Sequence, residues 1–127
     1  MIINRSIDIE DETRKALSDY VTAYCRPLPA EYDLPHILIT QVGGSTSQGI
    51  DTFEVVLDAR DKLEAGSLDC LNRAIGILKE VAKEQTSAIR HIVVNSSGSW
   101  GADPMRPDLA MCSARLSVVA HQIKEEV

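Results

Sequence analysis

Apolar residues recur every three or four positions in two segments, which is the spacing of a helix with one buried face. The first segment predicts a helix over residues 9–24, with Asp8 as its cap and three acidic residues in its first turn, where the helix dipole favours negative charge. Its apolar stripe comprises Leu17, Tyr20, Val21 and Tyr24. The second segment predicts a helix over residues 62–84, with a stripe comprising Leu68, Leu71, Ile75, Leu78 and Ala82.

Four further segments have the length and the apolar pattern of strands. They cover residues 36–42, 51–60, 89–95 and 110–121. Apolar and polar residues alternate in the second and fourth segments, as in a sheet with one packed face and one open face. The open face would carry Thr52, Glu54, Val56 and Asp58 beside Ser113, Arg115, Ser117 and Val119. A face of such mixed polarity suits contact with water or with another subunit.

The order of the predicted elements is helix, strand, strand, helix, strand, strand, which indicates the α/β class in its α+β two-layer form. We expect a largely antiparallel four-stranded sheet with both helices on one face. A chain of 127 residues has the usual size of one domain, and we therefore expect one domain over residues 1–127.

The composition narrows the functional classes. Hydrophobic residues at 44% and charged residues at 25% are near the averages of soluble globular proteins, and no apolar run approaches the roughly 20 residues that cross a bilayer. The first residues lack the pattern of a secretory signal, so we expect a cytoplasmic protein. Cys25, Cys70 and Cys112 are widely spaced without a metal-ligand pattern, and we expect buried free thiols.

A formal net charge of −6 argues against a protein that grips nucleic acid, because phosphate neutralisation requires a clustered basic face. The charge is compatible with a protein that surrounds DNA without holding it.

No set of residues assembles into a predicted catalytic, cofactor-binding or metal site. Gly43-Gly44-Ser45 follows a strand, but a second strand follows where a phosphate loop needs a helix, so the glycines are expected to let the chain turn. Residues 43–49 are expected to form a flexible, exposed connection. The serines at 96, 97 and 99 have no base placed beside them. The histidines at 36, 91 and 121 lie in predicted strands, and the aspartates at 51, 58 and 61 have no partner at metal spacing.

The sequence predicts a long loop over residues 97–108, between the last two predicted strands. This segment holds the only tryptophan, Trp100, together with two prolines and Arg106. Tryptophan and arginine are enriched among the residues that dominate binding energy at interfaces. The loop is therefore a candidate docking segment, and the alternative is that Trp100 folds back over the sheet edge as a lid on the core.

Three landmarks follow one another along residues 8–121. They are an apolar strand that ends in Gly43-Gly44, the strand of residues 51–60 before a helix that begins Leu63-Glu64-Ala65, and the loop Ser97-Gly98-Ser99-Trp100-Gly101-Ala102-Asp103-Pro104 with Arg106. In this order and spacing they resemble the tail terminator (tail completion) proteins of long-tailed bacteriophages. The chain departs from that pattern at Leu109-Ala110, where an aromatic residue is expected, which leaves the packing of the last strand open.

The resemblance implies a structural virion protein, not an enzyme. Such a protein forms a homohexameric ring on the head-proximal end of the tail tube, binds the tail tube protein, stops tube polymerisation and docks the head connector or head-closure protein. The genomic DNA passes through its channel without specific binding, and neither a cofactor nor a membrane takes part. The location implied is the tail-neck junction of the virion, after assembly in the host cytoplasm. The residues proposed for docking are Gly43, Gly44, Ser45, Gln48, Trp100, Asp103 and Arg106.

Three other functions remain open from the sequence. One is another ring-forming neck component, such as a head-closure or head-tail joining protein. A second is a small oligomeric enzyme whose active site joins His91, Arg115 and Asp58 from different subunits. A third is an adaptor that adds a strand to the sheet edge of a partner.

Overall fold

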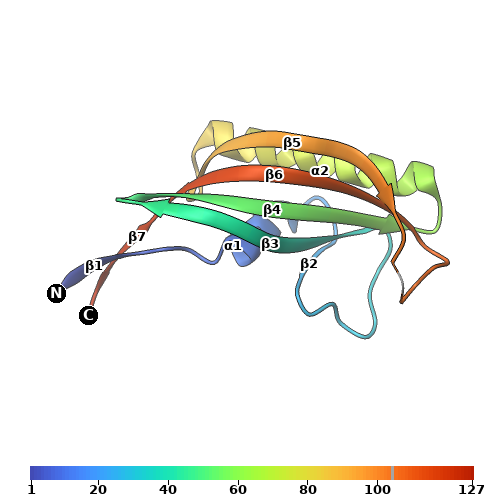
Figure 1. Cartoon of the computed structure of the whole chain (residues 1–127), viewed down its shortest axis with the longest axis horizontal. Helices are drawn as coiled ribbons and strands as arrows, with labels where there is room; N and C mark the ends of the chain where they lie inside the picture. The colour runs from blue at the N-terminus through green and yellow to red at the C-terminus, as the bar shows by residue number, and fades with distance from the viewer. Residues whose placement is uncertain (104) are drawn as a thin grey trace.

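The computed structural model describes residues 1–103 and 105–127, which form a five-stranded sheet packed against two helices (Figure 1). The sheet order is β2-β3-β4-β6-β5, and only the β2–β3 pair is parallel. A separate two-stranded antiparallel ribbon pairs β1 with β7 and brings the two chain ends together. The elements are β1 (Ile2–Arg5), α1 (Ile9–Leu17), β2 (Ala23–Cys25), β3 (His36–Ser47), β4 (Ile50–Asp61), α2 (Glu64–Glu84), β5 (Ile89–Gly101), β6 (Ala110–His121) and β7 (Ile123–Glu126).

The core lies between the helices and one face of the sheet, as the alternation of residues predicts. The odd-numbered residues of β4 from Phe53 to Ala59 are buried, and they face the buried even-numbered residues of β6. These two strands pair without a bulge along their whole length. Helix α1 adds Ile9 and Leu17 to the same core, and α2 adds its apolar stripe. The α+β class, the two helices and the mostly antiparallel sheet are thus confirmed.

The predicted four-stranded sheet is wrong, because the first helix is shorter than its apolar spacing indicates. Helix α1 ends at Leu17, where the Ser18 hydroxyl donates a hydrogen bond to the Lys15 carbonyl and competes with the helix ladder. The residues after the helix form a turn, and Ala23–Cys25 then pair with β3 as the fifth strand. The predicted cap is confirmed, since the Asp8 carboxylate accepts a hydrogen bond from the Asp11 N–H at 3.2 Å.

The connection predicted over residues 43–49 is also wrong. Strand β3 continues to Ser47, and residues 48–49 make a tight turn into β4, with Gly49 at φ +83°. A bulge between Gln41 and Gly43 shifts the pairing register by one residue, and the two strands stay paired beyond it. Gly44 lies so close to β4 that a Cβ there would be 2.7 Å from the Thr52 carbonyl oxygen. The glycines therefore allow strand pairing, where the sequence indicated a break.

Strand β5 likewise runs to Gly101, so that the first five residues of the loop predicted over residues 97–108 are strand. Two irregularities in its pairing with β6, between Val94 and Ser96 and between Ser96 and Ser99, absorb the serine-rich stretch, which includes Gly98 at φ +77°. Pro104 falls within that predicted loop and lies outside the described residues. Leu109, at the position where the sequence departs from the phage pattern, is buried with 5% of its surface exposed.

The predictions for the second helix and for two of the three cysteines agree with the structure. Helix α2 begins two residues after the predicted start and ends where predicted. All three cysteines are free thiols; Cys70 and Cys112 are buried, while Cys25 is only partly so. Within residues 1–103 and 105–127, no helix has the length and apolar character needed to span a membrane.

Candidate interaction surfaces

The sheet face opposite the helices is open and carries the predicted polar residues. The pairing of β4 with β6 places Thr52 opposite Val119, Glu54 opposite Ser117, Val56 opposite Arg115 and Asp58 opposite Ser113. Most of these side chains are half-buried by their neighbours, and Arg115 is exposed. The surface is therefore a flat array of hydroxyls and carboxylates with interspersed apolar residues.

Hydrogen bonds across the strands order this open face. The Ser117 hydroxyl donates to Glu54 at 2.7 Å, and the Asn95 amide donates to both Ser117 and Glu54 at 2.8 and 3.2 Å. Nearer the other end of the sheet, the Ser113 hydroxyl donates to Asp58 at 2.5 Å. Both carboxylates thus bind hydroxyl or amide donors, and neither forms a salt bridge among the described residues.

Four of the predicted docking residues lie on the β3–β4 hairpin at one end of the sheet. Gly43, Gly44 and Ser45 are exposed residues of β3, and Gln48 is in the turn. The first three line a groove of about 420 Å³ between the hairpin and the Ser6–Ile7 segment. Beyond Gln41 this part of β3 has no neighbour on its outer side, so it is a free edge among the described strands.

The other three predicted residues lie at the opposite end of the sheet. Trp100 is on the helix-side face of β5, opposite Cys112, and 49% of its surface is exposed. With about half of its surface covered on this face, Trp100 is not a fully buried core residue. Asp103 and Arg106 belong to the short segment between β5 and β6. Strand β4 separates the two ends by 12 residues, roughly 35 Å of extended chain.

Two arginines hold the segment after β5 in place, Arg60 from β4 and Arg106 from within the segment. Arg60, with only 8% of its side chain exposed, lies 3.2 Å from the Asp103 carboxylate in an ion pair that lacks hydrogen-bond alignment. Arg106 forms a two-pronged contact with Asp108 at 3.0 and 3.1 Å and also contacts the Tyr32 hydroxyl. Asp103 therefore has a structural partner inside the chain, whereas Trp100 presents its surface outward.

His36 is a buried histidine without an arrangement for catalysis. Its Nδ1 donates to the Asp33 carbonyl at 2.9 Å, and the rings of Tyr24 and Tyr32 pack edge-on against it. Burial and the nearby Arg60 charge hold the pKa of His36 below its usual value, although the Asp33 hydrogen bond acts in the opposite direction. Its imidazole is therefore neutral at physiological pH and closed off from a substrate.

The residues considered for an enzyme are spread out within one subunit. His91 pairs with Val119, Asp58 pairs with Ser113, and Arg115 lies between these positions on the same open face. The six steps along the strand from residue 113 to residue 119 correspond to about 20 Å. In the part of the chain that the structure describes, no group of three or more histidine, cysteine, aspartate or glutamate side chains is arranged to hold a metal ion.

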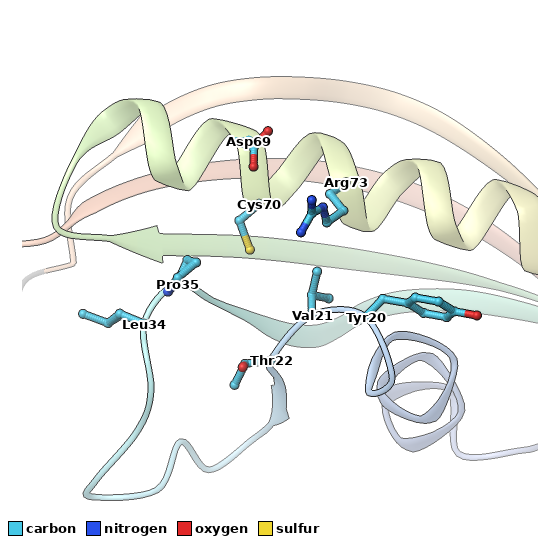
Figure 2. Close-up of a pocket in the computed structure, with 8 residues that line it drawn as sticks. All are labelled: Tyr20, Val21, Thr22, Leu34, Pro35, Asp69, Cys70 and Arg73. Carbon is cyan, nitrogen blue, oxygen red and sulfur yellow. The ribbon is translucent and has the colours of Figure 1, made fainter.

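A small pocket of about 200 Å³ opens between α2 and the segments before β2 and β3 (Figure 2). Cys70 and Arg73 project into it from α2, toward Val21 and Pro35. Burial, with the charges of two nearby aspartates, raises the pKa of the Cys70 thiol to about 11. The thiol is thus protonated at neutral pH and is a poor nucleophile.

The sequence reasoning missed the charged surfaces on either side of α2. Lys79-Glu80 and Lys83-Glu84 repeat the same dipeptide at a spacing of four residues, which places two lysines on one stripe of the helix and two glutamates on the next. All four side chains are exposed. The repeat itself was the available signal, since the two dipeptides can be read directly from the amino-acid sequence.

The chain matches no model of a known protein family, and no curated protein sequence matches it either.

Proposed function

We propose that this chain is a tail terminator of a long-tailed bacteriophage, a structural protein that forms a ring on the end of the tail tube and docks the head connector. The observation that carries the proposal is the order and spacing of the three landmarks along residues 8–121. Under this proposal the protein acts by shape and surface complementarity, without a catalytic step.

The positions of the candidate residues support a protein with two partners. The hairpin that carries Gly43 to Gln48 and the segment around Trp100 lie at opposite ends of the same sheet (Figure 1). A terminator has to bind the tube on one side and the connector on the other. Two exposed segments separated by the length of the sheet meet that requirement without competing for space.

The charge of the protein supports a channel that lets DNA pass. The net charge is −6, and the open sheet face sets the carboxylates of Glu54 and Asp58 beside the guanidinium of Arg115. Such a surface would repel phosphates instead of neutralising them, so DNA would slide past without a counterion-release gain in affinity.

The first experiment is to measure the mass of the purified protein by light scattering and to image any large species by negative stain. The proposal expects a closed six-membered ring, either in the protein alone or after tail tubes are added. A particle that stays monomeric and leaves tube ends free after tubes are added would overturn the proposal. Rings that bind connectors but not tubes would instead identify another neck component.

Trp100→Ala tests the docking segment directly. The proposal expects normal folding, normal rings and a loss of head-tail joining, because Trp100 is half exposed and is not part of the core. Met105→Ala is the control, since Met105 is 85% exposed in the same region. Unfolding of the Trp100 variant, or joining at the level of the control, would refute a docking role for this residue.

A further inference from the structure

The two sides of helix α2 carry opposite charge near its C-terminal end. The basic flank is a cleft of about 410 Å³ between α2 and the edge strand β5, and its charged lining consists of Lys79, Lys83, Arg90 and His91. Among the described residues, no acidic side chain lines this cleft. It lies at one edge of the sheet, because β5 is the last strand in the sheet order.

The acidic flank lies on the other side of α2, where this helix meets α1. Its charged residues are Glu12, Lys15, Asp19, Glu80 and Glu84. Lys15, the one cation that the described chain places in this flank, is already paired with Asp11 at 3.1 Å. The flank surrounds two grooves of about 210 and 280 Å³, with Ile77 and Val81 at the base of the first.

Tyr20 stands at the centre of the acidic flank. It borders both grooves, and 65% of its surface is exposed. An exposed tyrosine beside apolar side chains and ringed by charge is typical of the anchor of a protein interface. Its ring would also favour lysine or arginine side chains placed over its face.

The charges near the C-terminal end of α2 form one stripe of each sign. Lys79 and Lys83 are four residues apart, as are Glu80 and Glu84, so each stripe sets like charges next to each other. Within residues 1–103 and 105–127, none of these four side chains forms an ion pair. Glu80 and Lys83 are neighbours of opposite sign at a spacing of three residues. The arrangement leaves two surfaces of opposite sign that no ion pair among the described residues neutralises.

We propose that copies of this chain associate head to tail, with the acidic flank of one copy against the basic flank of the next and Tyr20 as the anchor. Charge complementarity identifies the partner as a second copy, because each flank is the counterpart of the other and they occupy different surfaces of one subunit. Such a heterologous contact repeats until the rotation closes a ring. The inference deepens the ring proposed above, and it rests on that proposal for closure.

The test uses charge reversal and sedimentation velocity at low and high ionic strength. Lys79→Glu with Lys83→Glu makes both flanks acidic, and Glu80→Lys with Glu84→Lys makes both flanks basic. Each double variant alone is expected to associate at least about tenfold more weakly than the parent protein, because like charges then meet. An equal mixture of the two, and the variant that combines all four changes, should regain association because opposite flanks meet again.

Control variants change the net charge equally at other exposed positions. Lys62→Glu with Lys124→Glu matches the first variant, and Glu31→Lys with Glu126→Lys matches the second. Both controls should associate like the parent protein. Circular dichroism confirms that each variant is folded.

Tyr20→Ala should also weaken association about tenfold, compared with Leu63→Ala, which truncates a side chain that is 72% exposed. A parent protein that stays monomeric at low ionic strength, or flank variants that associate like their controls, would overturn the head-to-tail contact. If the flank variants lose association but the parent forms dimers or open fibres, the proposed head-to-tail contact is supported and the proposed ring function is refuted. If all variants form hexamers regardless of the charge on their flanks, the proposed ring is supported and the proposed head-to-tail contact is refuted.

Discussion

Gly44 provides a sharp test of how the hairpin is built, because the neighbouring Gly43 is a matched control in the same strand. A Cβ added to Gly44 would be 2.7 Å from the Thr52 carbonyl oxygen and 3.3 Å from the Phe53 Cα. Both are backbone atoms of the paired strand and cannot move by a side-chain rotation. A Cβ on Gly43 would meet only the Glu54 side chain at 3.8 Å, an ordinary contact.

The expected magnitude follows from these distances. Replacing either glycine by alanine removes the same conformational freedom from the unfolded chain, which favours folding by about 0.4–1 kcal/mol. Gly44→Ala additionally forces β3 and β4 apart by several tenths of an ångström, and overpacking of this kind costs about 1–3 kcal/mol. We therefore expect Gly44→Ala to be less stable than Gly43→Ala by about 1–3 kcal/mol.

Urea unfolding followed by circular dichroism measures this difference. At a typical slope of about 1–3 kcal/mol per molar urea, the midpoint of Gly44→Ala should lie roughly 1 M below that of Gly43→Ala. Equal midpoints for the two variants would refute the reasoning, since they would show that Gly44 is not held against β4. Such a result would instead support the flexible connection that the sequence predicts over residues 43–49.

Three further predictions concern the core and its ionisable groups. Leu57→Ala, at a fully buried position, should lower the free energy of unfolding by about 2–5 kcal/mol, whereas Leu63→Ala, at a largely exposed one, should change it by less than about 0.5 kcal/mol in urea unfolding. Glu10→Gln should lower the free energy of unfolding by about 1 kcal/mol at neutral pH, because the Glu10 carboxylate binds Arg26 at 2.6 Å and the Gln41 N–H at 3.0 Å. Burial acts to raise the pKa of Glu10, but these bonds hold that pKa below its usual value, so their stabilisation is lost as pH falls through the pKa of the folded state. A Gln variant as stable as the parent in urea unfolding at neutral pH would contradict this prediction. Burial lowers the pKa of His36 in the folded protein, so as pH falls the unfolded chain takes up a proton near pH 6.5 before the folded chain does. The contribution of His36 to the free energy of unfolding is therefore full above that pH and decreases below it. Urea midpoints should decrease with falling pH in the parent and in His121→Gln, and this decrease should be absent in His36→Gln.

The sequence was sufficient for the features that depend on repeated burial. The alternation of Phe53, Val55, Leu57 and Ala59 predicts which face of β4 is packed, because side chains in a strand point to opposite faces in turn. The stripe of α2 and the cap at Asp8 follow from equally local rules. The open polar face could also be predicted, since it is the complement of the packed one.

Tertiary contacts determined the segments whose local sequence pattern fits more than one kind of secondary structure. Apolar residues over 20–24 fit a helix by spacing, but a parallel partner in β3 was available, so Ala23–Cys25 became a strand. Gly43 and Gly44 resemble a break in the sequence, yet the close approach of β4 requires a residue without a side chain at Gly44. Strand pairing joins residues far apart in the chain, and no local pattern encodes whether a partner strand will be present.

The candidate site shows the same division between sequence and structure. The types of residue in the hairpin and beside Trp100 indicated docking segments, but only the strand register placed them at opposite ends of one sheet. The lysine and glutamate repeat of α2 is plain in the sequence, whereas its meaning depends on what lies on each side of the helix. Packing set α1 and Tyr20 beside the glutamates and the edge strand β5 beside the lysines, and that placement turned a local repeat into two complementary surfaces.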